Sequence, residues 1–397
     1  MTNHNQVRQT PRATVNRRGA ARWRGGGHPW IYRSDVVKQP EGGAGAVHVV
    51  DESGGRTGTA LWSPTSQIAL RFISADHIDP DAAFWSERIA AAVRYRESLS
   101  PDATAYRVVH GEADGLPSLV VDSYGEHLVV QLLSAGLEAF RTDIVAALLE
   151  TCRPTGILAR NDVPVRRLEK LPEGIELLHG AVPEQVEVRE GGVTYLAAPW
   201  SGQKTGAFLD QRENRLRAGA LARGRALDCF SYHGSFALHL AGGADHVTAV
   251  DSSADALARA AHNAALNGDR AGRIEFVEAN AFDFLRAQDD AGETFDTIVI
   301  DPPAFAKRKD ALQAALRGYK ELNLRALRIL RPGGTLCTFS CSYHLSPWHF
   351  REMLESAAAD AGRPVRWIEW RGQASDHPEI VQIPESSYLK GAVLQAV

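Results

Sequence analysis

The chain has 397 residues, is 44% hydrophobic and 23% charged, and carries a formal net charge of −4. At about 150 residues per domain this length predicts two or three domains of ordinary globular composition. No apolar run approaches the roughly 20 residues of a membrane span, and the polar N-terminal segment lacks the apolar stretch of a secretion signal. Four scattered cysteines, without a Cys-x-x-Cys pair or a metal-ligand cluster, exclude a disulfide scaffold and a zinc site. We therefore expect a cytoplasmic protein without a metal.

Positive charge is concentrated at the N-terminus. The first 40 residues contain eight arginines and lysines and one acidic residue, Asp35. Such asymmetry is typical of a surface that binds a polyanion. Arg22 and Arg24 would contact RNA phosphates and Trp30 would stack on a base. A solvated basic tail is the alternative interpretation.

The first half of the chain predicts two β-rich units. Residues 45–74 alternate apolar and polar positions between glycines and prolines, which indicates a small β-barrel-like module ending near Ser74. An amphipathic helix follows, with Asp81 as its N-cap. Strands, a helix and further strands then succeed one another, which is typical of an α+β domain. The expected boundaries are 1–76 for the first domain, 77–182 for the central domain and 183–397 for the last.

The last domain begins with a hairpin around Gly191 and Gly192 and then alternates strands with helices from Arg225 onward. Continuous apolar strands between helices predict an α/β fold with a doubly wound, mostly parallel sheet of seven strands. The helix before the fifth strand is expected to end at the Pro-Gly-Gly sequence that starts at Pro332.

Open α/β sheets bind ligands beyond the carboxyl ends of their strands, so the strand ends are the places to search. The first strand ends at Asp228 and runs through Phe230 into a turn whose only glycine is Gly234. Close packing of strand and helix is as good an explanation of that glycine as a cofactor is. The second strand ends 23 residues later at Asp251, which suits a ribose diol, although helix capping is the alternative.

The remaining strand ends carry an amide, an acid and a thiol. Asn280 and Ala281 follow the third strand, where the amide would read an adenine edge. The fourth ends in Asp301-Pro302-Pro303, a rigid extended turn. The fifth ends at Cys341, which is predicted to lie beside Asp301. This order favours an S-adenosylmethionine pocket over a nicotinamide pocket, because the full G-x-G-x-x-G fingerprint is absent.

Cys341 is the candidate nucleophile. A cysteine in an apolar strand is usually a small core residue, and Cys337 fits that role inside the strand. Cys341 instead lies at the strand exit, between Ser340 and Ser342. A basic run, "AKRK", follows the Asp-Pro-Pro turn, where Lys307 and Arg308 would hold an RNA backbone unless the run is simply a solvated loop.

Several segments together resemble the RlmI-type ribosomal RNA (cytosine-C5-) methyltransferases. They include "KTGAFLDQREN", "DCFSYHGSFA", "DPPAFAKRK", "TFSCS" and "QASDHPEIVQIPESSYLKG", together with the early "RGGGHPWIYRSDV". The resemblance covers nearly the whole chain. It implies an N-terminal PUA domain, a central domain and a class I, Rossmann-like methyltransferase domain. It also implies S-adenosylmethionine as methyl donor, a cytosine of large-subunit rRNA as acceptor, and a homodimer as a family-level expectation.

The resemblance also assigns roles to single residues. It puts Cys341 in the catalytic position, Asp301 opposite the target base and Asp251 on the cofactor ribose. Gln211 and Arg212 are placed near the methionine end of the cofactor. The chain departs from the family pattern at three positions: Ser235, Asn280 and Ala304.

These residue types suit covalent catalysis, because C5 of cytosine is a poor nucleophile. Addition of a thiolate to C6 makes C5 electron-rich enough to accept a methyl group, and loss of the C5 proton then expels the thiolate. Which group removes that proton is left open. Methylation of a base nitrogen, with Cys341 structural, is the first alternative. A non-catalytic rRNA-binding or assembly protein is the second.

Overall fold

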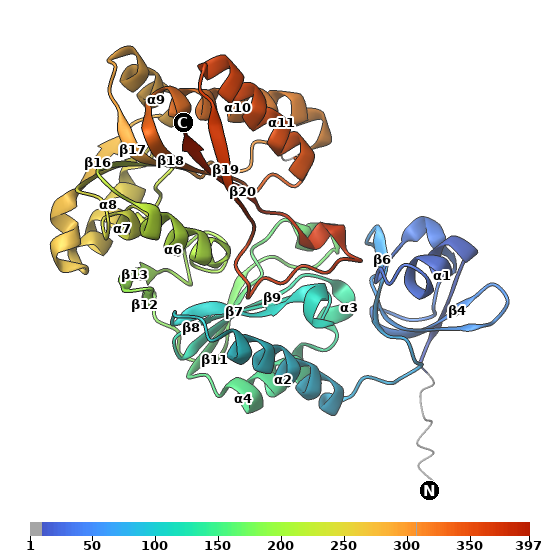
Figure 1. Cartoon of the computed structure of the whole chain (residues 1–397). Helices are drawn as coiled ribbons and strands as arrows, with labels where there is room; N and C mark the ends of the chain where they lie inside the picture. The colour runs from blue at the N-terminus through green and yellow to red at the C-terminus, as the bar shows by residue number, and fades with distance from the viewer. Residues whose placement is uncertain (1–9, 307) are drawn as a thin grey trace, which may run out of the picture. The chain divides into compact units, whose positions relative to one another are not determined.

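The structure, a computed structural model, describes residues 10–306 and 308–397. It divides into two compact units. The first contains residues up to 186 together with 197–207 and 376–386, and the second contains 187–196, 208–375 and 387–397. Figure 1 shows the course of the chain through both units.

The first unit begins with a six-stranded sheet in the order β2-β6-β5-β4-β1-β3. Its elements are β1 (Arg12–Val15), α1 (Arg17–Arg24), β2 (Trp30–Tyr32), β3 (Val36–Lys38), β4 (Gly45–Asp51), β5 (Arg56–Trp62) and β6 (Ile68–Ser74). Alternate residues of these strands form one apolar core with Ile31 and Trp62 fully buried. Trp23 of α1 stacks on Phe72, with ring centroids 4.6 Å apart, and thereby closes this core on the helix side. The sheet confirms the predicted β-rich module and its end at Ser74.

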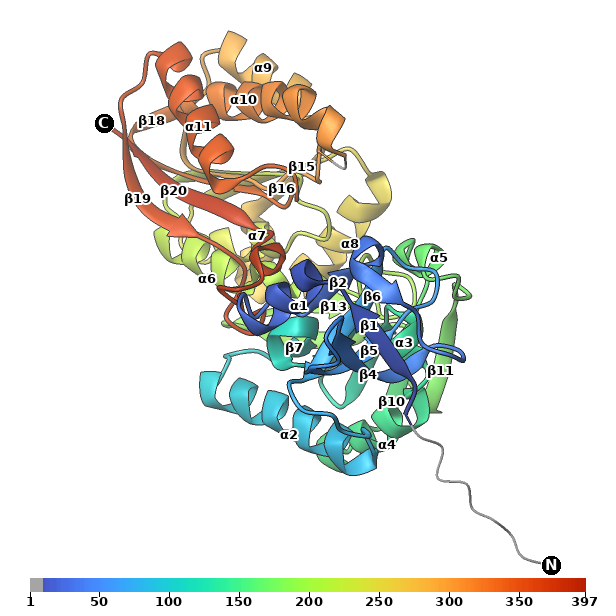
Figure 2. The ribbon, with the colours of Figure 1, turned by 90° about the vertical axis from the view of Figure 1, so that its right-hand side faces the viewer.

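A five-stranded sheet follows in the order β11-β10-β9-β8-β7. Its elements are α2 (Ala82–Leu99), β7 (Ala105–His110), β8 (Leu119–Tyr124), β9 (His127–Leu132), α3 (Ala135–Glu138), α4 (Arg141–Cys152), β10 (Gly156–Arg160), α5 (Val165–Leu168) and β11 (Ile175–Gly180). The Asp81 side chain accepts the Phe84 amide at 2.9 Å, as predicted for an N-cap. Helices α2 and α4 lie side by side in Figures 1 and 2 and bury Trp85, Ile89 and Leu148 against the sheet.

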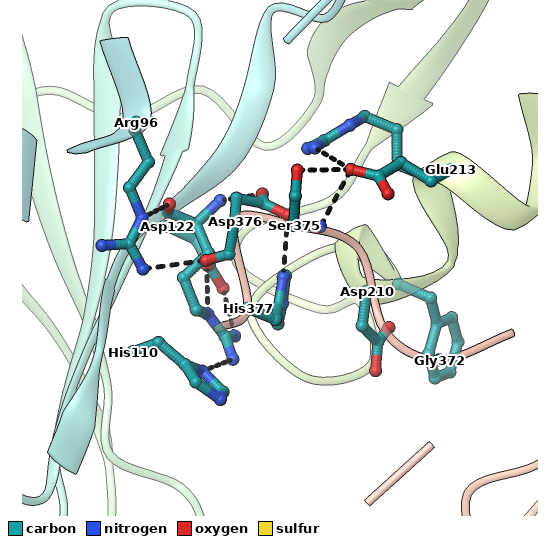
Figure 3. Close-up of polar contacts among 12 residues, drawn as sticks. Arg96, His110, Asp122, Asp210, Glu213, Gly372, Ser375, Asp376 and His377 are labelled. Carbon is teal, nitrogen blue, oxygen red and sulfur yellow. Dashed lines mark hydrogen bonds and ion pairs between the residues drawn. The ribbon is translucent and has the colours of Figure 1, made fainter. Parts of the chain in front are cut away.

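Two later stretches of chain return to this sheet, which explains why 197–207 and 376–386 belong to the first unit. Tyr124 Oη lies 3.0 Å from the Thr205 hydroxyl and accepts the Ala207 amide. The Arg107 amide donates to Asp376 Oδ2 at 2.8 Å. The Arg96 guanidinium donates to the Asp376 carbonyl at 2.8 Å, and Figure 3 shows both of these residues. Buried polar groups, rather than apolar contacts alone, thus fix both returning segments.

The second unit opens with the hairpin of β12 (Val186–Glu190) and β13 (Val193–Ala197). Gly191 and Gly192, with φ of 52° and 77°, form the turn that the sequence predicted, since two consecutive left-handed residues favour glycine. A seven-stranded sheet follows in the order β16-β15-β14-β17-β18-β20-β19. Its strands are β14 (Arg225–Cys229), β15 (His246–Asp251), β16 (Ile274–Glu278), β17 (Phe295–Ile300), β18 (Leu330–Ser340), β19 (Val365–Arg371) and β20 (Lys390–Ala396).

Strands β14 to β18 are parallel, and β20 runs antiparallel between β18 and β19. Helices cover both faces: α6 (Arg212–Leu221), α7 (Ser235–Leu240), α8 (Ala254–Ala265), α9 (Ala281–Asp290), α10 (Leu312–Arg328) and α11 (Pro347–Ala361). Figure 1 shows α6, α7 and α8 on one face and α9, α10 and α11 on the other. Each face has its own apolar core, one including Phe236 and Leu240 and one including Leu322 and Phe350. The predicted doubly wound α/β sheet is confirmed.

One predicted boundary is wrong. Helix α10 ends at Arg328, and β18 already begins at Leu330, so the Pro332-Gly333-Gly334 sequence lies inside a strand instead of closing the helix. The buried Leu330 pairs with Phe295, whose amide donates to the Ile329 carbonyl at 2.8 Å. A register shift between Phe295 and Thr297 accommodates the proline, which cannot donate a ladder hydrogen bond. Burial of Leu330 therefore outweighs the local turn signal.

Among the helices that the structure describes, none is long and apolar enough to span a bilayer.

Candidate active site at the carboxyl edge of the seven-stranded sheet

The parallel pairing brings the predicted strand-end residues to one edge of the sheet. Cys229 lies beside Val250 on one side and Ile300 on the other, and Ile300 lies beside Thr338. The residues that follow these positions therefore line the same edge, because parallel strands end in the same direction. They are Phe230 after β14, Asn280 and Ala281 after β16, Asp301 after β17 and Cys341 after β18, and they join Asp228 at the penultimate position of β14 and Asp251 at the last position of β15.

Asp228 carries a buried carboxylate with spare hydrogen-bonding capacity. Its Oδ2 accepts the Ser231 hydroxyl at 2.7 Å and the Ala237 amide at 3.0 Å. Its Oδ1 is buried without a partner among the described residues. Burial, reinforced by the charges of Asp301 and Asp251, raises the pKa of Asp228 to about 7. An unpartnered acceptor at the edge of a sheet is suited to a donor on a ligand.

The turn after β14 is left-handed at three positions. Phe230, Tyr232 and Gly234 have φ of 66°, 52° and 84°. A Cβ atom at Gly234 would lie 2.9 Å from the Ala260 Cβ, so α8 packs directly against this residue. This contact agrees with the packing interpretation of the glycine, and a role of Gly234 in cofactor binding stays a prediction. The same turn brings the Tyr232 amide to within 2.8 Å of Asp251 Oδ2.

Asp251 is not the N-cap of α8. Ser253 is the cap, and its side chain accepts the Ala256 amide at 3.2 Å. Asp251 instead accepts the Tyr232 amide through Oδ2 and the Ser253 amide through Oδ1, and it is half-buried. Each carboxylate oxygen has a second lone pair, so the group can still accept hydrogen bonds from a diol.

Asn280 caps α9. Its Oδ1 accepts the Phe282 amide at 2.9 Å, which leaves its Nδ2 as the donor that could reach a base edge. The neighbouring Ala281 is buried, and the Phe282 ring lies 6.1 Å from that of Phe305. The ring of Phe282, two residues after the capping Asn280, thus lies near a second aromatic ring.

Asp301 is held by a side chain from a distant segment. Gln211 Nε2 donates to Asp301 Oδ1 at 2.9 Å. Asn214 Nδ2 in turn donates to Gln211 Oε1 at 2.6 Å, which fixes the orientation of that amide. The resemblance placed Gln211 near the methionine end of the cofactor, and it gave no indication of this contact with Asp301.

Arg212, the next residue, is 2% exposed, and its guanidinium lies 3.4 Å from Glu213 Oε1. Glu213 Oε1 also accepts the Ser375 amide at 2.8 Å, as Figure 3 shows. These contacts join the start of α6 to the segment before 376, within the second unit.

The two cysteines of β18 have different surroundings. Cys337 is 1% exposed, and burial raises the pKa of its thiol to about 12. Cys341 is half-buried and follows the last residue of the strand. The structure therefore separates a core thiol inside β18 from a half-buried thiol just beyond the end of that strand.

The turn after Cys341 is built from hydrogen bonds of Ser342. Its Oγ accepts the Ala306 amide at 3.1 Å and lies 2.9 Å from the Tyr319 hydroxyl. Its carbonyl accepts Lys390 Nζ at 2.7 Å. Tyr319 and Lys390 were not singled out from the sequence. The antiparallel register that sets Ser340 opposite Lys390 was the one available signal, and it requires knowledge of the strand order.

The arginines predicted to bind RNA at the N-terminus lie on α1. The Arg22 guanidinium lies over the Tyr32 ring, 4.8 Å from its centroid. Arg24 forms an ion pair with Asp51 at 2.7 Å. Both arginines lie on an accessible helix, and each guanidinium already has a partner: the Tyr32 ring for Arg22 and the Asp51 carboxylate for Arg24.

Trp30 and the basic loop complete the predicted RNA contacts. Trp30 is half-buried and its Nε1 donates to Glu112 at 2.8 Å. Arg308 is exposed and lies 3.2 Å from Asp310. Lys307 lies outside the described residues.

A seven-stranded sheet with this strand order, and with acids at the ends of its first two strands in sequence, defines a class I S-adenosylmethionine-dependent methyltransferase. A family model described as S-adenosylmethionine-dependent methyltransferase matches residues 159–391, and one described as PUA-like domain matches residues 14–75. The chain is 43% identical to ribosomal RNA large subunit methyltransferase I of Shewanella amazonensis over 92% of this chain and 94% of that one. It is 42% identical to the protein of the same name from Salmonella arizonae, over 92% of each. The chain therefore belongs to the ribosomal RNA large subunit methyltransferase I family.

Solved structures agree with the fold. A methyltransferase complexed with SAH superposes with a TM-score of 0.84 and 23% identity, over 97% of this chain and 99% of the other. A SAM-dependent methyltransferase from Streptococcus mutans gives 0.81 and 22%, over the same shares.

The residues present fit S-adenosylmethionine as the cofactor. The unpartnered Asp228 Oδ1 and the two-oxygen acceptor of Asp251 suit the hydroxyls and amine of such a molecule. Asn280 offers an amide donor with an aromatic ring nearby. The predicted cofactor class is thus confirmed by the family and is compatible with the side chains at this edge.

Proposed function

We propose that the protein methylates carbon 5 of a cytosine in large-subunit ribosomal RNA through a covalent bond between the Cys341 sulfur and C6 of the base. The single observation that carries this proposal is the half-buried Cys341 at the exit of β18, next to the strand that ends in Asp301. The names of the relatives support ribosomal RNA as the substrate class. The other two cysteines of this sheet that the structure describes, Cys229 and Cys337, are both buried.

In this reaction Cys341, Asp301 and Gln211 have different roles. The Cys341 thiolate attacks C6 of the ring, and the electron pair of the C5–C6 bond then makes C5 nucleophilic. Asp301 binds the N3/N4 edge and favours protonation at N3 while the sulfur adds. Gln211 holds the Asp301 carboxylate in place. S-adenosylmethionine, when bound, supplies the electrophilic methyl group; loss of the C5 proton then breaks the S–C6 bond and restores the ring.

The cofactor would be held along the strand ends. We assign Asp228, Phe230 and Gly234 of the first turn, with Asp251 on the ribose, to this role. Asn280 and Ala281 would face the adenine, and Gln211 and Arg212 the methionine end. Asp301 would border both substrates.

The RNA would be bound by groups in both units. Arg22, Arg24 and Trp30 of the PUA-like domain would contact phosphates and a base. Arg308, with Lys307 beside it in sequence, would hold the backbone near the target. The target cytosine must be unpaired or flipped from its stack to reach the thiol. We retain as proposals the domain limits 1–76, 77–182 and 183–397, a cytoplasmic location and a homodimer.

The test is methyl transfer by Cys341→Ser and by the matched control Cys337→Ala, which lies on the same strand. Each purified protein is incubated with labelled S-adenosylmethionine and 23S rRNA from cells that lack the protein, and the nucleosides are identified by mass spectrometry. We expect 5-methylcytidine from the wild type and from Cys337→Ala, and a loss of about 1,000-fold or more for Cys341→Ser. Retained turnover in Cys341→Ser, or a product methylated on nitrogen, would contradict the proposal.

A further inference from the structure

The turn that bears Cys341 lies against a buried lysine. Lys390 is the first residue of β20 and stands opposite Ser340, the last residue of β18, in the antiparallel pair. Its side chain is 3% exposed. Its Nζ donates to the Ser342 carbonyl at 2.7 Å and to the Tyr388 carbonyl at 2.8 Å. The ammonium is therefore held within one residue of the candidate nucleophile.

No carboxylate balances this charge. Within residues 10–306 and 308–397, no aspartate or glutamate oxygen lies within 4.0 Å of Lys390 Nζ. Buried cations are normally paired with an anion, because carbonyl dipoles alone do not replace full hydration. Burial accordingly lowers the pKa of Lys390 to about 8, whereas the charge of Cys341 acts in the opposite direction. A negative charge on Cys341 would therefore raise the pKa of this lysine and stabilise its ammonium form.

Two of the three ammonium protons are donated to the Ser342 and Tyr388 carbonyls. A lysine ammonium has three donors and no acceptor, so one proton remains for a further acceptor. A thiolate is a suitable acceptor, and it gains more from a cation in a buried site than in water.

We propose that the Lys390 ammonium is the counter-cation of the Cys341 thiolate and keeps the attacking sulfur ionised at neutral pH. This assignment rests on the proposed function, in which the Cys341 thiolate is the group that attacks C6 of the base. Lys390 is then a positioning residue that acts through the sulfur, and it does not contact the base.

The other ionisable groups around the thiol do not favour its ionisation. Tyr319 approaches from α10 through its hydrogen bond with Ser342; burial raises the pKa of this phenol, so it stays neutral. Asp301 follows the neighbouring β17, and an ionised carboxylate there would oppose a thiolate. Lys390 offsets that opposition.

The test measures the reactivity of the Cys341 thiol and needs no RNA. Wild type, Lys390→Gln and Lys390→Arg are alkylated with iodoacetamide from pH 5.5 to 10, and the modified peptides are quantified by mass spectrometry. We expect the inflection for Cys341 to rise by about one pH unit or more in Lys390→Gln and to stay near the wild-type value in Lys390→Arg. Cys152, whose pKa burial raises to about 11, serves as the internal control, and its profile should not change.

A purely structural role is distinguished by the pH profile of methyl transfer. If Lys390 acts through the sulfur, Lys390→Gln loses about 10-fold in kcat at pH 7 and recovers most of it at pH 9, where the thiol ionises unaided. An identical alkylation inflection in wild type and Lys390→Gln, or a loss of activity that is equal at both pH values, would overturn the proposal. Failure of the proposed function would show differently, as retained methyl transfer by Cys341→Ser, whatever the alkylation profile.

Discussion

Two sets of buried charged groups in the second unit differ in how completely they are paired. Beside the hairpin, Glu190 accepts hydrogen bonds from Arg215 Nε at 2.6 Å and Arg215 Nη2 at 2.7 Å. His239 Nε2 lies 3.0 Å from the same carboxylate, and the Tyr195 hydroxyl donates to it at 3.3 Å. All the oxygens of this carboxylate have partners within the chain. We call this cluster closed, because its buried charges are fully paired with one another.

The buried charged groups at the strand ends, Asp228 and Lys390, are only partly paired, and we call this set open. Asp228 has a buried oxygen without a partner among the described residues, and Lys390 has no carboxylate beside it there. A closed cluster contributes to stability and to the seating of the hairpin against α6 and α7. An open cluster retains capacity for a cofactor or a reacting group, at some cost in stability. We therefore expect substitution in the fully paired set to lower stability, and substitution in the partly paired set to affect ligand binding or the reaction.

The largest expected effect comes from opening the closed cluster. Glu190→Ala leaves Arg215 buried without its anion, and we expect a loss of about 3–5 kcal/mol in the free energy of unfolding. The matched control is Glu293→Ala, which removes the exposed partner of Arg225 and should cost less than about 1 kcal/mol. Urea denaturation of both variants measures the difference. Equal losses would show that the buried cluster is not a stability element.

The glycine of the cofactor turn is the next test. Gly234→Ala places a Cβ at φ 84° and 2.9 Å from the Ala260 Cβ, so we expect a loss of about 2–3 kcal/mol and weaker S-adenosylmethionine binding. Gly292→Ala is the control, because its φ is 70° and nothing lies within 4 Å. It should cost only the backbone strain of about 1–2 kcal/mol. A Gly234→Ala protein as stable as the control would rule out the packing explanation.

A smaller effect is expected at Gln211. Gln211→Ala removes the amide that holds Asp301, so we expect kcat to fall about 10-fold, with a smaller rise in the KM for S-adenosylmethionine from the loss of a group at the methionine end. Steady-state kinetics against the exposed control Gln313→Ala provides the comparison. A raised KM with unchanged kcat would favour the role at the methionine end instead.

The smallest effect is a pH dependence of stability. The folded pKa of Asp228, about 7, lies above the unfolded value near 3.9, so the folded state binds more protons between these two values. Wild-type stability therefore falls as pH rises through this window, by about 1 kcal/mol or more. Asp228→Asn lacks this loss, so its stability relative to wild type should improve from pH 5 to pH 8 in thermal melts. A difference that does not change with pH would contradict a buried acid that is hard to ionise.

Much of the fold could be predicted because its signals are local. Continuous apolar runs mark the parallel strands, Gly191 and Gly192 mark the hairpin, and Asp81 marks a helix start. The strand ends then place Asp301 and Cys341 along one edge by topology alone. The local turn signal at Pro332 failed because burial of Leu330 decided where the strand began.

The contacts that were missed join residues distant in sequence. Gln211 and Asp301 are 90 positions apart, and Ser342 and Lys390 are 48 apart. Neither pair has a periodicity that a sequence displays, and the second depends on the register of an antiparallel strand. The charge composition of the N-terminus likewise gave no indication that the Trp30 indole donates a hydrogen bond to Glu112.

The most direct test of the central claim is a covalent trap. An rRNA fragment containing 5-fluorocytidine is incubated with the protein and S-adenosylmethionine, and the complex is digested and mapped by mass spectrometry. Fluorine at C5 cannot leave as a proton does, so the account predicts a stable adduct through the Cys341 sulfur that carries the transferred methyl group, and none in Cys341→Ser. An adduct on another residue, or release of methylated RNA without any adduct, would contradict it.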